Sequence, residues 1–431
     1  MMLEVEVISK EIIKPSSPTE DHVRHYQLSF LDQVSPMVYN PIVLFYSCDG
    51  ITQFNRTTIS EKLKKSLSDV LTHFYPLAGR LNGNSTFIEC YDEGVPYLEA
   101  RVKCKVVDVI SKPVPGELNR LVPFLLHDVT NITFGVQLNV FDCGGIAIGA
   151  CLSHQIADGL SFFTFLNCWA AIAREESVLP NPQFISAKLF PPKNISGFDP
   201  RSGIVKENII CKMFVFDGSV VENLRARYAA GATRVEALSV FIWSRYVAVT
   251  RKQSLPQRTY AVIHAVNLRP KMEPPLPPDS FGNYYRITMT TSSFNTEEEC
   301  HDLDLAKQVR DQIKKIDKDY VRKLQDGNEH SNFLKDISFR VLEKGELVSF
   351  SITSLCRFPL YDSDFGWGKP TWVGSPALSF KNLVVLIDAK NGGGIEAYVS
   401  LKVEDMAKFE ADEELLAFVN TPRASSFMRA M

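Results

Sequence analysis

The stretch GIAIGACLSHQIADGLSFFTFLNCWAAIA, residues 145–173, is the part of the sequence that decides the fold class. Residues 145–153 are small and apolar and predict a buried central strand, and a helix is predicted to begin near Asp158 or Ser161. His154 lies directly after the strand, in the polar turn that joins the two elements. Such a turn holds side chains in place while leaving them accessible, so we expect reactive groups here.

Outward from this stretch, strand and helix patterns mix along the whole chain. Apolar runs predict strands at 3–13, 41–46, 86–90, 97–108, 134–141, 210–216, 260–266, 383–388 and 395–401. Helical spacing of apolar residues predicts helices at 58–74, 219–229, 237–249, 297–325 and 411–419. Two helix starts show the capping-box pattern, Thr58 with Glu61 and Thr233 with Glu236. Strands and helices mixed in this way predict an α/β or α+β protein.

Chain length and one biased segment predict two domains. The 431 residues correspond to two or three domains of about 150 residues each. Residues 186–208 are rich in proline, glycine, serine and lysine and lack periodicity, which is typical of a linker. We therefore expect an N-terminal domain at 1–185, a crossover linker at 186–208 and a C-terminal domain at 209–431.

Composition excludes several classes of protein. Hydrophobic residues make up 45% and charged residues 23%, so the chain can bury a large core and is not disordered. A net charge of −3 lacks the basic excess of a nucleic-acid binder. The nine cysteines contain no C-x-x-C pair, which predicts free thiols rather than a disulfide framework or a zinc site. With no signal-peptide pattern and no apolar run of transmembrane length, we expect a cytoplasmic protein that binds no membrane.

The turn HQIADG, residues 154–159, contains the best candidate for catalysis. An imidazole can take and return a proton near neutral pH, so His154 is a candidate general base. Asp158 could orient that imidazole or pair with an arginine and hold the loop. From spacing alone, a turn histidine beside a helix-capping aspartate is the more frequent reading. Because Cys151 and Ser153 alternate away from His154 and no G-x-S-x-G elbow occurs, we expect His154 to activate a hydroxyl or amine of the substrate.

The second candidate motif is DFGWGKP, residues 364–370. D-F-G also occurs in protein kinases, but the kinase reading fails because no V-A-I-K strand, no H-R-D loop and no glycine-rich phosphate loop accompanies it. On physical grounds, two glycines flanking a tryptophan predict a tight structural turn in which Asp364 binds backbone amides.

The two motifs together, about 210 residues apart, resemble those of the plant BAHD acyltransferases, most closely the members that acetylate alkaloids. These enzymes move acyl groups from coenzyme A thioesters to alcohols or amines. The resemblance spans nearly the whole chain and includes further motifs in the same order: IKPSSPT (13–19), YPLAGR (75–80), TRVEAL (233–238), VNLRP (266–270), FGN (281–283) and GIEAYV (394–399).

The resemblance implies a fold and a set of roles. We expect two chloramphenicol-acetyltransferase-like domains, each a mixed sheet with flanking helices, and a channel between them that coenzyme A and the acceptor enter from opposite sides. His154 would be the general base, with no acyl-enzyme, and Asp158 would pair with Arg269. The structural-support residues would be Asp364, Phe365, Gly366, Trp367 and Gly368. Thr233 would contact coenzyme A, at a helix N-terminus suited to phosphate.

One position departs from the family pattern. Leu355 stands where close relatives have tryptophan, which removes an indole N–H and a broad ring from the acceptor side of the site. Thr353 and Asn283 are the remaining candidates for an oxyanion donor or an acceptor contact.

The sequence therefore predicts a metal-free, monomeric O-acyltransferase. It would use acyl-CoA, expected to be acetyl-CoA, and a small-molecule alcohol of plant specialised metabolism, expected to be an alkaloid. The alternatives are an N-acyltransferase acting on an amine and a non-catalytic family member that binds a ligand.

Overall fold

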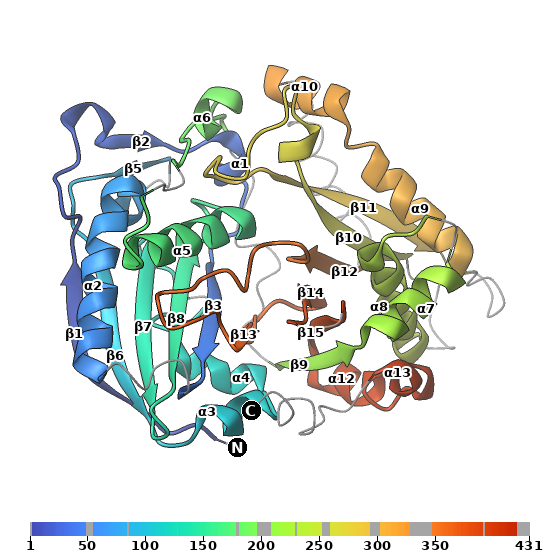
Figure 1. Cartoon of the computed structure of the whole chain (residues 1–431). Helices are drawn as coiled ribbons and strands as arrows, with labels where there is room; N and C mark the ends of the chain where they lie inside the picture. Colours follow the sequence, from blue (N-terminus) through green and yellow to red (C-terminus); the bar gives the residue numbers. More distant parts are fainter. Residues whose placement is uncertain are drawn as a thin grey trace.

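The computed structural model describes residues 2–48, 55–83, 86–126, 128–177, 181–195, 208–228, 231–251, 259–293, 302–327, 347–390 and 393–419. Two six-stranded mixed sheets, each accompanied by helices, form two lobes that lie side by side (Figure 1). A three-stranded sheet lies at the edge of the first lobe and consists of β2 (His25–Gln27), β5 (Phe87–Glu89) and β4 (Arg80–Leu81). The α/β class and the two sheet-containing lobes expected from the sequence are confirmed.

The first sheet is built around the predicted central strand. Its strands, in spatial order, are β1 (Val5–Ile13), β6 (Val95–Val102), β7 (Phe134–Phe141), β8 (Ile146–Ser153), β3 (Tyr39–Tyr46) and β13 (Trp372–Gly374). Every residue of β8 is buried, because the strand lies between β7 and β3 and beneath α5 (Gly159–Ala173). Helices α5 and α2 (Arg56–His73) pack side by side over one face of the sheet. The strand–turn–helix expected at 145–173 is thus confirmed.

The second six-stranded sheet forms the other lobe. Its strands, in spatial order, are β11 (Tyr285–Ser293), β10 (Thr259–Asn267), β12 (Leu347–Ser354), β14 (Leu383–Asp388), β15 (Ile395–Lys402) and β9 (Ile209–Phe216). The helices of this lobe are α7 (Gly218–Arg227), α8 (Arg234–Thr250), α9 (Asp302–Lys314), α10 (Lys318–Asp326), α12 (Val403–Phe409) and α13 (Glu413–Phe418). The short helices elsewhere are α1 (Phe30–Gln33), α3 (Val106–Ile110), α4 (Pro115–Leu118) and α6 (Ser186–Leu189).

One strand crosses from the C-terminal half of the chain into the first sheet. Strand β13 pairs antiparallel with β3, with Trp372 opposite Phe45. The DFGWGKP motif, which precedes β13 in the sequence, also packs against the first lobe. The ring of Phe365 lies edge-on against Trp169 of α5, at a centroid distance of 4.9 Å. By packing, residues 364–374 therefore belong to the first lobe, although the expected C-terminal domain of 209–431 includes them.

Several local expectations differ from the structure. The predicted Thr58–Glu61 capping box is wrong, because α2 begins two residues earlier and Asn55 caps it by accepting from the Thr58 backbone N–H at 2.9 Å. The Thr233–Glu236 box of α8 is confirmed.

Element lengths also differ in three places. The helix expected at 297–325 is two helices, since Asp317 caps a new start at α10. The strand expected at 97–108 ends at Val102, and α12 precedes the predicted last helix. Most of the expected linker, 196–207, lies outside the described residues.

Candidate active site

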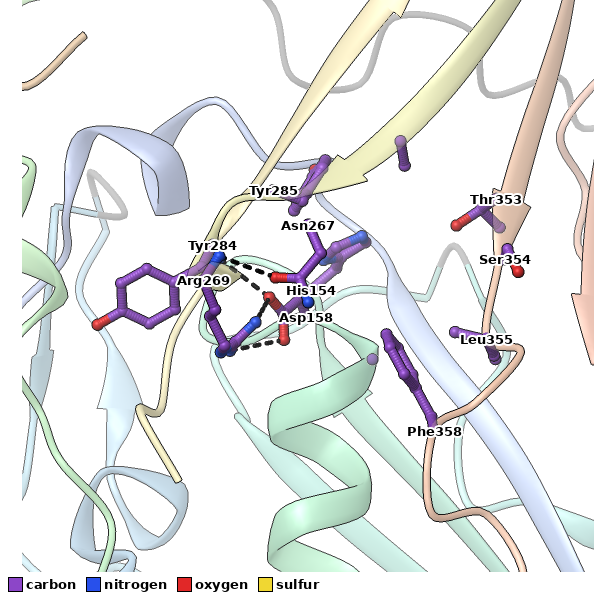
Figure 2. Close-up of a pocket in the computed structure, with 12 residues that line it drawn as sticks. His154, Asp158, Asn267, Arg269, Tyr284, Tyr285, Thr353, Ser354, Leu355 and Phe358 are labelled. Carbon is purple, nitrogen blue, oxygen red and sulfur yellow. Dashed lines mark hydrogen bonds and ion pairs between the residues drawn. The ribbon is translucent and has the colours of Figure 1, made fainter. Parts of the chain in front are cut away.

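The site is a pocket between the two sheets, with a volume of about 100 Å³. The turn after β8, the ends of β10 and β12 and the start of β11 supply its walls (Figure 2). The lining residues are His154, Asp158, Gly159, Ala265, Asn267, Arg269, Tyr284, Tyr285, Thr353, Ser354, Leu355 and Phe358. Pockets that hold a drug-sized ligand usually measure about 300–1,000 Å³, so this pocket is smaller than a site for a whole molecule of that size.

His154 is fixed by its backbone while its ring lines the pocket. Its N–H donates to the Val38 carbonyl at 2.9 Å, and its own carbonyl accepts from the Asn283 side-chain amide at 2.8 Å. The ring lies against that of Tyr285, with centroids 5.5 Å apart. Burial lowers the pKa of the imidazole below its ordinary value, so His154 is neutral at physiological pH and can accept a proton.

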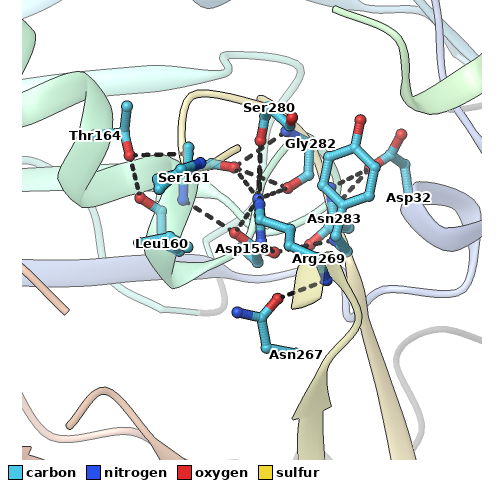
Figure 3. Close-up of polar contacts among 12 residues, drawn as sticks. Asp32, Asp158, Leu160, Ser161, Thr164, Asn267, Arg269, Ser280, Gly282 and Asn283 are labelled. Atoms are coloured by element: carbon cyan, nitrogen blue, oxygen red, sulfur yellow. Dashed lines mark hydrogen bonds and ion pairs between the residues drawn. The ribbon is translucent and has the colours of Figure 1, made fainter. Parts of the chain in front are cut away.

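Asp158 faces away from the imidazole and binds Arg269. The guanidinium donates to both carboxylate oxygens, at 2.7 and 3.1 Å (Figures 2 and 3). The same carboxylate accepts from the backbone N–H groups of Ser161 and Tyr284, each at 3.0 Å. Burial alone would raise the pKa of Asp158, but Arg269 and these donors hold it below its usual range.

Asp158 therefore acts both as a helix cap and as the partner of an arginine. It caps α5 through Ser161, and it joins the turn of the first lobe to the Arg269 segment of the second. The expected Asp158–Arg269 pair is confirmed as a contact.

The DFGWG motif forms a turn outside the pocket. Asp364 accepts from the backbone N–H groups of Gly366 and Gly368, at 2.8 and 2.9 Å. Both glycines have positive φ, 103° and 97°, a conformation that other residues rarely adopt. Phe365 and Trp367 are buried against the first lobe. The geometry is that of a structural turn, and a link to a coenzyme A channel stays a prediction.

The other candidates from the sequence separate into two groups. Thr353 and Leu355 line the pocket. Asn283 does not line the pocket. It is fully buried behind His154, and its amide N–H₂ donates to Asp32 and to the His154 carbonyl, so this geometry gives no support to the expected contact with the acceptor or the oxyanion. Thr233 caps α8 and is absent from the lining, and its contact with coenzyme A stays a prediction.

Several pocket residues were not foreseen from the sequence. Asn267 lies in the VNLRP motif that also contains Arg269, so the motif itself was the available signal. Gly159 allows a close approach, since a Cβ at this position would lie 2.8 Å from a methyl group of Leu355. Tyr285 and Phe358 have no local pattern that marks them.

Two further features concern ligands and environment. Among the residues that the structure describes, no three histidine, cysteine, aspartate or glutamate side chains are grouped so that they could hold a metal ion. Within the same part of the chain, no helix has the length and apolar character needed to cross a membrane.

A neutral histidine in a pocket shared by two lobes, with neither Cys151 nor Ser153 in the lining, is an arrangement suited to an enzyme that uses general acid–base catalysis. Comparison with known proteins agrees with this class. The chain belongs to the Transferase family, whose model matches residues 3–416. This is the BAHD acyltransferase family that the motifs resemble, and the chain is accordingly an acyl-CoA-dependent acyltransferase.

Similar proteins cover nearly the whole chain. Stemmadenine O-acetyltransferase from Catharanthus roseus is 38% identical over 427 residues, covering 96% of this chain and 97% of the relative. Vinorine synthase from Rauvolfia serpentina is 36% identical over 436 residues, covering 98% and 99%.

Solved structures show the same architecture. The crystal structure of vinorine synthase aligns with a TM-score of 0.85 at 34% identity, covering 97% of this chain and 99% of that one. A structure of F. sporotrichioides TRI101 complexed with coenzyme A and T-2 aligns with a TM-score of 0.70 at 20% identity, covering 93% of this chain and all of that one, and supports the fold alone.

Proposed function

We propose that this enzyme transfers an acetyl group from acetyl-CoA to a hydroxyl of a bulky plant specialised metabolite, an alkaloid in the first instance, with His154 as general base. The observation that carries the proposal is a neutral imidazole at the wall of a pocket that both lobes build. The names of similar proteins support the acyl group and the acceptor class, since they include O-acetyltransferases of stemmadenine and of a limonoid.

The reaction proceeds without an acyl-enzyme. His154 takes the proton of the acceptor hydroxyl as the oxygen attacks the thioester carbonyl, and a tetrahedral oxyanion forms. The intermediate collapses, the C–S bond breaks, and the imidazolium returns its proton to the departing thiolate. A positioned base of this kind typically contributes about 10²–10⁴-fold to the rate.

The oxyanion needs a donor aimed at it. Of the candidates that the sequence singled out, Thr353 lines the pocket and has a hydroxyl, whereas the Asn283 amide is engaged behind the histidine. We assign the donor role to Thr353, at the end of β12. Its replacement by valine removes the hydroxyl and keeps the shape, and should lower kcat with the KM values little changed.

The acceptor side is apolar. Leu355 and Phe358 form one wall of the pocket, close to Gly159, and offer no hydrogen-bond donor from their side chains. Such a wall suits the hydrocarbon skeleton of a polycyclic alcohol and leaves recognition of the reacting hydroxyl to His154. The proposal includes a monomer in the cytoplasm, as the sequence predicts, which size-exclusion chromatography and imaging of a fluorescent fusion would check.

The test is an acyl-CoA panel assayed against a library of plant alcohols and amines, with products identified by mass spectrometry. We expect acetyl esters as the main products, and no turnover by His154→Ala, which should keep its fold and its binding of coenzyme A. A clear preference for benzoyl-CoA or coumaroyl-CoA, or amides as the main products, would overturn the acetyl or the hydroxyl part of the proposal. Full activity of His154→Ala would overturn the base.

A further inference from the structure

A buried carboxylate in the first lobe lies directly behind the catalytic turn. Asp32, on the short helix α1, has no exposed surface, and it is 122 residues before His154 in the sequence. One of its oxygens, Oδ2, accepts from the backbone N–H and the hydroxyl of Ser29, at 2.8 and 2.6 Å. Local capping and a longer contact from the Ser186 hydroxyl, at 3.4 Å, account for this oxygen but not for the other.

The second oxygen binds the other lobe. Asp32 Oδ1 accepts from both the backbone N–H and the side-chain amide of Asn283, at 3.1 and 2.9 Å (Figure 3). Asn283 lies between Gly282 and the start of β11 and is itself fully buried. A carboxylate is an acceptor only, so it requires the N–H₂ end of the Asn283 amide to face it.

The same N–H₂ group also donates to the His154 carbonyl at 2.8 Å. Two acceptors therefore hold the N–H₂ end of the Asn283 amide, and this fixes the position of the amide oxygen at the opposite end of the group. That oxygen is buried without a hydrogen-bond partner, and so is Nδ1 of His154. Burial has the largest effect on the His154 pKa and lowers it. The backbone of His154 itself, the charge of Asp158 and, after them, the Asn283 side chain raise this pKa. The effect of Asn283 has the direction expected of a hydrogen-bond acceptor near the ring.

We propose that Asp32 is a positioning residue that acts on His154 through Asn283, fixing the amide so that its oxygen selects the imidazole tautomer with the proton on Nδ1. The other ring nitrogen, Nε2, is then the one without a proton and serves as the base. The tautomer of a histidine is set by the partner of its second nitrogen, and a neutral asparagine alone could turn over and present N–H₂ instead. The inference rests on His154 being the general base.

Two single variants and their combination separate this role from a merely structural one. Asp32→Asn keeps the shape but gives Asn283 or Ser29 a donor where each needs an acceptor, and Asn283→Ala removes the link. Either substitution should lower kcat by about 10- to 100-fold with little change in the KM for acetyl-CoA, which is the effect expected when a catalytic base is displaced by up to about 1 Å. In the Asn283→Ala background, Asp32→Asn should change kcat by less than about twofold.

A direct readout comes from the ring nitrogens. Long-range ¹H–¹⁵N NMR of the ¹⁵N-histidine-labelled protein reports the tautomer and the pKa of His154. The His154→Ala spectrum assigns the signals, and the measurement does not require the acyl-acceptor substrate. We expect the Nδ1–H form in the wild type, and in Asp32→Asn and Asn283→Ala a mixture of tautomers with a His154 pKa below that of the wild type. Asp412→Ala, which removes a partly buried helix cap remote from the pocket, controls for lost stability and should leave the His154 signals unchanged.

Three results would overturn the inference. They are a wild-type tautomer with the proton on Nε2, an unchanged His154 spectrum in Asn283→Ala, and additive effects of the two substitutions on kcat. If Asp32→Asn does not fold, the His154 tautomer in the wild type and in Asn283→Ala still tests the link from the amide to the imidazole, without which Asp32 has no route to His154. Failure of the proposed function has a different signature, since His154→Ala would then retain turnover whatever the tautomer.

Discussion

Replacing Glu396 by glutamine should stabilise the enzyme at alkaline pH and leave it nearly unchanged at acid pH. Glu396 lies on β15 of the second sheet and is 7% exposed. Its oxygens accept from the indole N–H of Trp372, at 3.1 and 3.2 Å, and from the Tyr398 hydroxyl at 3.0 Å. Trp372 belongs to β13 of the first sheet, so this carboxyl joins the lobes at their junction. Within the described ranges, no lysine, arginine or histidine forms an ion pair with Glu396.

The magnitude follows from the pKa of Glu396, which burial raises from 4.5 to about 7. Below pH 4.5 the carboxyl is protonated in both the folded and the unfolded chain, and contributes no pH dependence. Between 4.5 and 7 only the unfolded chain ionises, so folding stability falls as pH rises. Above pH 7 the loss is complete and amounts to about 3 kcal/mol, or a Tm lower by roughly 3–4 °C for a chain of this length.

The assay is thermal unfolding of the wild type and Glu396→Gln at pH 5 and pH 8. Glutamine keeps an oxygen for Trp372 and an N–H₂ for Tyr398, so the Tm of the variant should exceed that of the wild type clearly at pH 8 and only slightly at pH 5, where the unfolded chain has begun to ionise. Glu99→Gln is the matched control of opposite sign, because contacts with Ser60 and Arg56 overcome the effect of burial and lower the pKa of Glu99. An equal Tm difference for Glu396→Gln at both pH values would refute the reasoning.

Three further predictions concern the pocket. Because the His154 pKa is lowered, the neutral imidazole persists to a lower pH than that of an ordinary histidine. The midpoint of the acid limb in a plot of kcat/KM against pH should therefore lie below pH 6.5, and a midpoint above 6.5 would contradict this. Asp158→Ala leaves Arg269 buried and unpaired, so unfolding by denaturant should show a loss of about 3–5 kcal/mol together with lost activity, and an unchanged midpoint would disprove the structural role. Leu355→Trp adds a ring beside Gly159, so in steady-state kinetics the substitution should raise the KM for a bulky acceptor more than the KM for a small alcohol. Equal increases in the two KM values would argue against an acceptor wall here.

Local chemistry explains which elements the sequence predicts well. Strand β8 is continuous and apolar, α8 has a true capping box, and the turn at His154 joins two strongly patterned elements. The misplaced start of α2 shows the limit of such reasoning. Thr58 and Glu61 match the capping pattern, but Asn55 accepts from the Thr58 backbone N–H and begins the helix earlier.

Long-range pairing explains what the sequence does not predict. Strand β13 has only three residues, Trp372–Gly374, and exists because β3 offers it an unpaired edge. The Asp158–Arg269 pair came from resemblance to a family, since nothing in the spacing of residues 111 positions apart selects that partner.

The sequence by itself determined the two-lobed α/β class, the strand–turn–helix that presents His154, and membership of an acyltransferase family, because these depend on local periodicity and on motifs that can be read in order. Only the tertiary structure decided that Asn283 lies behind the histidine, that Asp32 holds it there, and that Glu396 joins the two sheets. Burial and the direction of a hydrogen bond arise when distant segments pack, and no stretch of the chain encodes them alone.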